Sequence, residues 1–312
     1  MRAFHMNLQV YNANTAYPDG GEATSKHDKL IKEMKKYSNK RPFGLSEKIV
    51  DIAGFTEVIV SNGAEPRNIK NALTDLGESL NIRNSNYHIA VIRCGRTALQ
   101  SSNEVVGIVI NGDATIQTFG LAYLRSETSG GPFRWVNREI PATDRYTFFN
   151  DDVTNDVILD YRHVVYAKFK LDDKTYTVGF IHNRRPGQHE GISTMQRLRA
   201  LVGRKNLNIE GRKLELTMCG GDFNVVAPTE AEGKGRGVKV GHDGNRNQLW
   251  YYSPGKTTRS NPYDYWMSKK ELEDPDLRDS FFDRTALSEK TPAEPDPAIT
   301  GSDHRGVDIE IS

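Results

Sequence analysis

A carboxylate and a carboxamide, Asp222 and Asn224, stand two positions apart in residues 219–224, Cys-Gly-Gly-Asp-Phe-Asn. An apolar run over 214–218 predicts a buried strand before them, and the two glycines would then let the backbone turn sharply. Residues two apart in an extended segment point to the same side. Both side chains would therefore lie together at a strand end, where α/β folds often place their chemistry. An ordinary Gly-Asp turn has the same composition, so the rest of the chain must decide.

Similar polar residues stand at the ends of other predicted strands. Together with Asp222 and Asn224, they make seven positions: Asn7, Glu57, Arg162, His182, Asp222 with Asn224, Asp264, and Asp303 with His304. Taken singly, a glutamate after a strand is usually solvated, and a lone histidine is more often structural than catalytic. Seven such positions at the ends of separate strands are harder to explain as isolated surface residues, so we expect them to form a shared site.

The elements that would carry these residues include both strands and helices. Alternation of apolar and polar residues over 3–10 predicts a strand, and residues 50–55 predict a second one with Glu57 just beyond its end. Helices with an apolar face at helical spacing are expected to begin at Ser25, a capping residue, and at Pro66.

The middle of the chain predicts a β-meander. Strands are expected over 87–93, 104–110 and 114–124, with Asn111-Gly112 as a hairpin turn between the last two. A long irregular aromatic stretch, 125–155, follows. The later expectations are a hairpin of 162–171 with 175–181, a helix from Ser193, a flexible loop over 227–248, short strands over 248–253 and 263–267, a proline-containing segment over 287–300, and a last strand with Val307, Ile309 and Ile311.

Composition limits the classes of function. Lys and Arg number 42 against 41 Asp and Glu, so the chain has no general electrostatic attraction to nucleic acid, although a local basic patch is compatible with this balance. No apolar run reaches the length of a membrane span, and the N-terminus has no signal-peptide core. We expect a cytoplasmic protein, a protein exported by a route that needs no such signal, or a mature chain from which a signal has been removed. Cys94 and Cys219 are expected to be buried thiols.

The polar positions and their neighbours resemble motifs of the endonuclease/exonuclease/phosphatase superfamily, the fold group of pancreatic deoxyribonuclease and the abasic-site endonucleases. The likeness runs nearly end to end. Its most specific parts are Gly221-Asp222-Phe223-Asn224 and Ser302-Asp303-His304. The others are Asn7-Leu8-Gln9, Phe55-Thr56-Glu57-Val58, Arg162-His163-Val164-Val165, Ile181-His182-Asn183 and Tyr263-Asp264-Tyr265. The loop after His182 is similar to that of the nuclease subunits of cytolethal distending toxins.

The resemblance implies an α/β (α+β) fold, a four-layer sandwich of two facing mixed β-sheets flanked by helices, as one domain over residues 1–312. It also implies hydrolysis of a phosphate ester by a metal-activated water. The residue types agree with this chemistry, because Mg²⁺ neutralises phosphate charge and prefers oxygen ligands. Mn²⁺ and Ca²⁺ are the alternative ions.

Each residue of the set then has an expected role. Glu57, Asp303 and Asn7 are expected to bind the metal ion, and Arg162 and Asn224 the substrate phosphate. The expected catalytic residues are His304 as general base, Asp264 as its partner, His182 as acid or transition-state stabiliser, and Asp222 beside them.

Two positions depart from the pattern of the superfamily. Deoxyribonuclease pairs the histidine equivalent to His182 with a glutamate in the segment that corresponds to about 92–94, and residues 91–94 contain no acid. The partner of His182 is therefore unassigned. Thr56 stands where glutamine is common, which alters the local hydrogen bonding.

The sequence thus predicts a divalent-metal-dependent phosphodiesterase of the deoxyribonuclease type that cleaves DNA. We expect it to act as a monomer, with association with partner subunits as the alternative. A phosphatase acting on phosphoinositides or other phosphomonoesters is the alternative within the same fold. An inactive binding scaffold is the alternative from another class, although such a scaffold would have no physical need for the whole set of polar residues.

Overall fold

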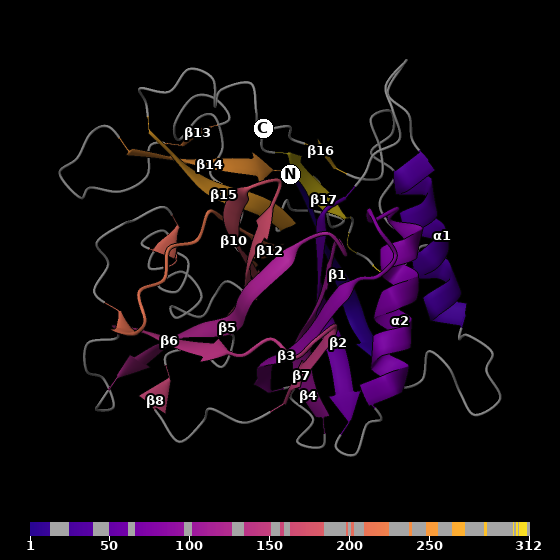
Figure 1. Cartoon of the computed structure of the whole chain (residues 1–312), viewed down its shortest axis with the longest axis horizontal. Coiled ribbons are helices and arrows are strands. Elements are labelled where there is room, and N and C mark those ends of the chain that lie inside the picture. The colour runs from indigo at the N-terminus through magenta and orange to yellow at the C-terminus, as the bar shows by residue number, and fades with distance from the viewer. Residues whose placement is uncertain are drawn as a thin grey trace.

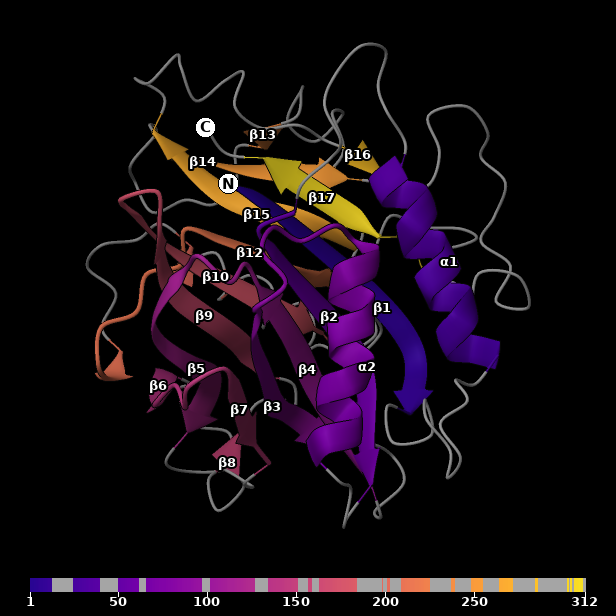
Figure 2. The same cartoon turned by 45° about the vertical axis from the view of Figure 1, so that its right-hand side comes forward.

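The computed structural model describes residues 1–12, 25–39, 50–61, 66–96, 102–126, 134–150, 157–158, 163–183, 198, 201–202, 209–224, 237–238, 248–254, 264–271, 284–285, 302, 304 and 306–310. Two mixed β-sheets face each other, and helices α1 (Ser25–Asn39) and α2 (Pro66–Ser79) cover the outer side of the first sheet (Figures 1 and 2). Among the described residues, no helix is long and apolar enough to cross a membrane. Four parts of the chain considered above lie outside the described residues: Arg162, Asp303, the segment 287–300 and most of the loop 227–248.

The first sheet contains seven strands among the described residues. In spatial order they are β16 (Arg284–Thr285), β17 (Val307–Glu310), β1 (Arg2–Asn12), β2 (Ile52–Ser61), β4 (Ser102–Ile110), β3 (His88–Arg96) and β7 (Tyr146–Phe149). Strand β1 lies parallel to β2 and antiparallel to β17. The first and last strands of the chain therefore meet inside one sheet, as Figure 2 shows.

The second sheet contains ten of the described strands. In spatial order they are β11 (Glu210–Gly211), β6 (Arg134–Ile140), β5 (Thr115–Ser126), β9 (Val164–Leu171), β10 (Lys174–His182), β12 (Met218–Asp222), β15 (Asp264–Glu271), β14 (Gln248–Pro254) and β13 (Gly237–Val238), with β8 (Val157–Ile158) also paired to β5. The predicted hairpin of β9 and β10 is confirmed.

Three apolar cores hold the layers together. The core between the sheets contains Phe119, Phe180 and Trp266. The second core joins the first sheet to α1 (Ser25–Asn39) and α2 (Pro66–Ser79), which begin where the sequence predicted. The third core, on the outer face of the second sheet, contains Leu198 and Leu201, both helical. Three stacked cores require four layers, so the predicted sandwich is confirmed. The expected start of the last helix, Ser193, lies outside the described residues.

Two expectations about connections were wrong. Asn111-Gly112 does not close a hairpin, because β4 pairs with β2 and β3 whereas β5 belongs to the other sheet. The chain crosses between the sheets at this turn. The stretch 125–155 is not irregular throughout, since it contains β6 and β7.

The two glycines before Asp222 lie inside β12 and do not form the sharp turn expected from the sequence. A Cβ atom on Gly221 would stand 2.0 Å from the carbonyl oxygen of Ile181, and one on Gly220 would stand 2.7 Å from the ring of Trp266. No side chain fits at either position, so the glycines allow β12 to lie close to its neighbours. The predicted strand over 214–218 begins only at Met218.

Candidate active site

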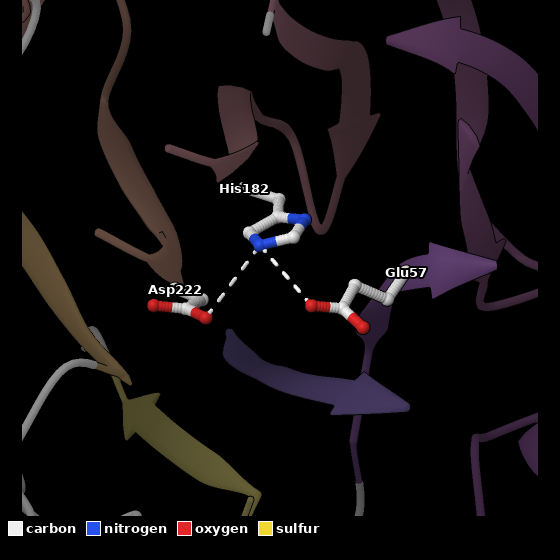
Figure 3. A group of neighbouring side chains, drawn as sticks. All are labelled: Glu57, His182 and Asp222. Carbon is white, nitrogen blue, oxygen red and sulfur yellow. Dashed lines mark ion pairs between the residues drawn. The ribbon is translucent and has the colours of Figure 1, made fainter. Parts of the chain in front are cut away.

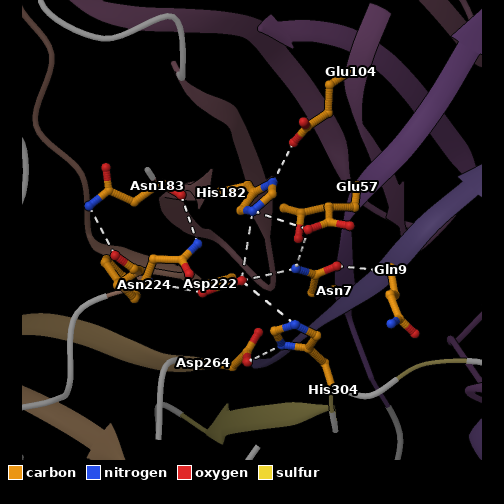
Figure 4. A network of polar contacts seen from close by, with 12 residues as sticks. Asn7, Gln9, Glu57, Glu104, His182, Asn183, Asp222, Asn224, Asp264 and His304 are labelled. Carbon is orange, nitrogen blue, oxygen red and sulfur yellow. Dashed lines mark hydrogen bonds and ion pairs between the residues drawn. The ribbon is translucent and has the colours of Figure 1, made fainter. Parts of the chain in front are cut away.

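The polar residues that the structure describes converge where β10 and β12 of the second sheet end and β15 begins, facing β1 and β2 of the first sheet (Figure 4). His182 is the last residue of β10, Asp222 the last of β12, and Asp264 the first of β15. The register of the sheet places His182 opposite Asp222 and Asp222 opposite Asp264. Parallel pairing of β10 with β12, followed by antiparallel pairing with β15, therefore brings three titratable side chains side by side.

The first sheet contributes Asn7 from β1 and Glu57 from β2. Glu57 was expected just beyond a strand, but it lies within β2 at an irregularity where the register shifts between Phe55 and Val58. Its backbone φ is 54°, in the left-handed region. An irregularity of this kind turns a side chain away from the direction that regular alternation would give it.

A matching irregularity in β1, between Asn7 and Tyr11, supplies backbone donors to this site. The N–H of Val10 donates to Oε2 of Glu57 at 2.9 Å, and the N–H of Gln9 donates to Oδ1 of Asn7 at 2.8 Å. Gln9 and Val10 also have positive φ, 49° and 57°. Strained backbone of this kind persists only where the surrounding structure imposes it.

Asn7 connects the carboxylates of the two sheets. Its Nδ2 donates to Oε1 of Glu57 at 3.2 Å and to Oδ2 of Asp222 at 3.0 Å. Because its Oδ1 accepts from the Gln9 N–H, the amide nitrogen is the atom that faces the two acids. Asn7 therefore fixes the spacing of Glu57 and Asp222.

His182 has the acidic partner that the sequence left unassigned. Its Nδ1 lies 2.5 Å from Oε1 of Glu104, which is buried at the start of β4. Its Nε2 faces Oε1 of Glu57 at 3.2 Å and Oδ2 of Asp222 at 3.8 Å (Figure 3). The pattern of the superfamily pointed to 91–94, whereas the acid comes from the neighbouring strand. The signal for it was an acid directly before the apolar run Val105–Ile110.

His304 forms a second histidine–carboxylate pair. Its Nδ1 lies 2.7 Å from Oδ2 of Asp264, and its Nε2 lies 3.8 Å from Oδ2 of Asp222. The hydroxyl of Ser302 accepts a hydrogen bond from the His304 N–H and donates one to the carbonyl oxygen of Asn7. These contacts attach the segment that carries His304 to β1.

Asp222 lies between the two histidines and is almost completely buried. Burial raises the pKa of its carboxyl group, and the nearby charge of Asp264 raises it further. The two histidines and the N–H of Asn224 act in the opposite direction. The carboxyl group thus lies between two imidazoles, with its Oδ2 3.8 Å from the Nε2 atom of each.

Asn224 faces away from the histidines. Its N–H donates to Oδ1 of Asp222 at 2.9 Å, and its Nδ2 donates to the carbonyl oxygen of Asn183 at 2.8 Å. In these contacts it supports the end of β12 and the backbone after β10. Its expected contact with phosphate stays a prediction. Arg162 and Asp303 are outside the described residues, so the structure does not place these two expected ligands.

The donor set fits a divalent cation. Ligand atoms of Glu57, His182 and Asp222 lie within 4.8 Å of one another, and so do those of Asp222, Asp264 and His304. Both histidines already contact a carboxylate through Nδ1, whereas the carboxylate oxygens of Glu57 and Asp222 face a common space. Hard oxygen donors of this kind suit Mg²⁺, which keeps several of its waters.

Comparison with solved structures shows a shared fold. An endonuclease/exonuclease/phosphatase family protein from Leptotrichia buccalis C-1013-b aligns over the whole chain and 99% of its own length, with 13% identity and a TM-score of 0.52. A humanised TDP2 of D. rerio aligns over the whole chain and 98% of its length, with 12% identity and a TM-score of 0.51.

The catalytic domain of human Nocturnin, solved with a bound sulfate anion, also aligns over the whole chain and covers 93% of that structure, with 11% identity and a TM-score of 0.50. No family model matches the sequence, and no curated protein matches it significantly. At these identities the likeness establishes the fold, and the argument for function depends on the geometry of the site.

Proposed function

We propose that this protein is a divalent-metal-dependent phosphoesterase that hydrolyses phosphodiester bonds, with DNA as its substrate. The observation that carries the proposal is the pair of buried histidine–carboxylate couples, His182–Glu104 and His304–Asp264, whose Nε2 atoms both face Asp222. Hydrolysis of a phosphodiester needs one group to take a proton from water and another to supply one to the departing oxygen. Two oriented imidazoles on either side of one point meet both needs.

His304 is the general base of this proposal. The contact between its Nδ1 and Asp264 leaves Nε2 as the atom that faces the site. A carboxylate on one ring nitrogen fixes the tautomer and raises the basicity of the other nitrogen. Nε2 of His304 would accept the proton of the attacking water, and Asp264 would stabilise the imidazolium that forms.

His182 has the complementary role. Its Nδ1 is held by Glu104, so its Nε2 points to the side of the site formed by Glu57 and Asp222. A protonated Nε2 can donate to the departing oxygen. The alkoxide of a sugar is a poor leaving group, so a proton donor at this place lowers the barrier to its departure.

A divalent cation would be held by the oxygens of Glu57, with Asp303 as a second proposed ligand and Asn7 beside them. When bound, it would neutralise charge on the phosphate and on the leaving oxygen. The proposed contacts of Arg162 and Asn224 with the phosphate belong to the same hypothesis. The Val10 N–H holds Glu57 on the side of Oε2, which keeps Oε1 directed into the site.

Nicking of supercoiled plasmid DNA by the purified protein, with Mg²⁺ and with EDTA, tests this function. We expect nicking in Mg²⁺ that EDTA abolishes and that His304→Ala loses. His88→Ala is the matched control, because His88 lies at the far end of β3 from the site.

Two other outcomes would reject nucleic acid as the substrate. Hydrolysis of phosphoinositides or other phosphomonoesters in the absence of nicking would retain the metal-dependent chemistry and change the substrate class. Inertness towards all these esters, with an intact fold, would leave a binding scaffold as the function.

A further inference from the structure

A third histidine, His5 on β1, is fully buried and lies behind the site. Along β1, Ala3 packs in the core between the sheets, whereas Phe4, Met6 and Leu8 pack towards the helices. Alternation therefore directs His5 towards the second sheet. His5 is completely buried and lies opposite Gly54 of β2 and Val307 of β17. A position that would normally hold an apolar core residue holds an imidazole.

The two ring nitrogens of His5 face different groups. Nε2 lies 3.1 Å from Oγ1 of Thr56, and Nδ1 lies 3.7 Å from Oδ1 of Asp264. Thr56 and Asp264 are also completely buried. Within the part of the chain that the structure describes, Nδ1 of His5 has no hydrogen-bond partner, so Asp264 is the polar group towards which it is directed.

The charge of Asp264 determines which tautomer of His5 fits. With the proton on Nε2, the lone pair of Nδ1 would face a carboxylate oxygen in a low-dielectric interior, which is repulsive. With the proton on Nδ1, the N–H points at Oδ1, and Nε2 accepts from the hydroxyl of Thr56. Thr56 can donate in this way because a hydroxyl rotates to suit its partner.

We propose that His5 is a positioning residue that fixes the Asp264 carboxylate, and through it His304, by an Nδ1–H group whose tautomer the charge of Asp264 sets, while the Thr56 hydroxyl holds the ring at Nε2. This inference rests on the proposed function, because it assigns a role in the same reaction. Asp264 would then have a polar group at both oxygens: Nδ1 of His304 lies 2.7 Å from Oδ2, and Nδ1 of His5 lies 3.7 Å from Oδ1, where its N–H attracts the carboxylate electrostatically. Rotation of the carboxylate would break both contacts, so the ring of His304 keeps its Nε2 towards Asp222.

Thr56 gives this arrangement a second consequence. It directly precedes Glu57 at the irregularity of β2, so the chain of contacts Thr56–His5–Asp264–His304 starts beside a proposed metal ligand in one sheet and ends at the proposed base. The position of the base relative to Glu57 is thereby fixed through the core between the sheets.

NMR of protein labelled with ¹⁵N in histidine tests the tautomer without any substrate. We expect the proton of the His5 ring to lie on Nδ1 at pH 7, and Asp264→Asn, which removes the charge that Nδ1 faces, to shift the ring towards a mixture of tautomers. A proton on Nε2 of His5 in the wild-type protein would overturn the proposal. This measurement gives an answer even if the protein hydrolyses no phosphate ester, so it separates the failure of this inference from the failure of the proposed function.

Kinetics then test the role in catalysis. His5→Leu removes the donor, and we expect kcat to fall about 10- to 100-fold, as is typical when a group that orients a site residue is lost, with KM within about threefold. His5→Asn keeps an N–H near the position of Nδ1, so it should lose clearly less. In an Asp264→Ala background, His5→Leu should cause no further loss, because His5 acts through Asp264.

Several outcomes would contradict the inference. They are a wild-type kcat for His5→Leu, equal losses for His5→Leu and His5→Asn, or a full additional loss in the Asp264→Ala background. Circular dichroism and thermal unfolding accompany each variant. If His5→Leu does not fold, the comparison of wild type, His5→Asn and Thr56→Val decides the question, and equal kcat in all three would reject the proposal.

Discussion

The Nε2 atoms of His182 and His304 lie at the same distance, 3.8 Å, from one oxygen of Asp222. Each histidine contacts a different buried acid through Nδ1. The two rings come from distant parts of the chain, and the strands that carry Asp222 and Asp264 bring them together (Figure 4). This near-symmetry about one carboxylate is why we assign a base and an acid to the two histidines.

The first prediction concerns these histidines. His304→Ala and His182→Ala should each lower kcat by about 10²- to 10⁴-fold, the usual contribution of a positioned acid or base. The double variant should lose much less than the product of the two factors, because groups that act in one step are not additive. Steady-state kinetics on plasmid or oligonucleotide DNA measure these losses. If the loss of the double variant equals the product of the two single losses, the two histidines act independently and the prediction is wrong.

The second prediction concerns Glu104. Glu104→Gln removes the charge that holds Nδ1 of His182, so kcat should fall about 10-fold or more while the fold is retained. Glu33→Gln is the matched control, since Glu33 is also a buried acid but lies on α1. Equal turnover in the two variants would show that Glu104 does not assist His182.

Part of the site could be predicted from the sequence because it depends on local patterns. Strand ends are visible as the limits of apolar runs, and the polar residues at or next to these limits were found in this way, including Asp222, Asp264 and both histidines. Helices α1 and α2 were found from their capping residues and apolar spacing. The apolar faces that this spacing identified are the faces that pack against the first sheet.

The remainder depends on contacts between distant segments. Glu104 pairs with His182 across 78 positions, and only the packing of the first sheet, which contains β4, against the second, which contains β10, brings them together. Gly220 and Gly221 suggested a turn because local reasoning cannot see Trp266 or Ile181, whose atoms occupy the space of any side chain there. Asn111-Gly112 failed for the same reason, since a hairpin and a crossover between sheets can share the same turn residues.

The third prediction concerns metal binding. Glu57→Gln replaces a charged oxygen ligand with a neutral amide, so the affinity for Mg²⁺ or Mn²⁺ should fall at least about tenfold. Glu78→Gln, an exposed change on α2, should leave the affinity unchanged. Isothermal titration calorimetry and the metal-induced rise in Tm provide the readout. An unaltered metal titration for Glu57→Gln would remove Glu57 from the ligand set.

The fourth prediction concerns acid stability and a buried histidine outside the site. His27 on α1 contacts the hydroxyl of Tyr11 through Nδ1 at 2.6 Å and Asp75 through Nε2 at 3.2 Å. Burial lowers the pKa of His27, although the nearby charge of Asp28 opposes this. Because the pKa in the folded state is the lower one, the unfolded chain binds the proton first.

Stability should therefore be lost as the pH falls below about 6.5, with a slope of at most about 1.4 kcal/mol per pH unit from this residue. Urea unfolding between pH 7 and 5 should show a weaker pH dependence for His27→Gln than for wild type. Tyr11→Phe, which keeps the buried imidazole, should retain the wild-type dependence. A slope that is unchanged in His27→Gln would assign the acid sensitivity to other groups.

The last prediction concerns the strained backbone beside Glu57. Val10 has a φ of 57° although it is β-branched, and the residue is 64% exposed, so packing does not offset the strain. Asparagine tolerates the left-handed region and keeps the backbone N–H that donates to Glu57. Val10→Asn should therefore raise the free energy of unfolding by about 0.5–1 kcal/mol, within the cost of roughly 1–2 kcal/mol for this conformation.

Thr175→Asn provides the matched control, because Thr175 is an exposed β-branched residue on β10 without a positive φ. There the same replacement should destabilise the protein slightly, since asparagine is disfavoured in strands. Urea unfolding of both variants at pH 7 makes the comparison. Similar destabilisation in both variants would show that the conformation of Val10 stores no strain. A higher free energy of unfolding for Val10→Asn and a lower one for Thr175→Asn would show that the segment that holds Glu57 in the site is strained.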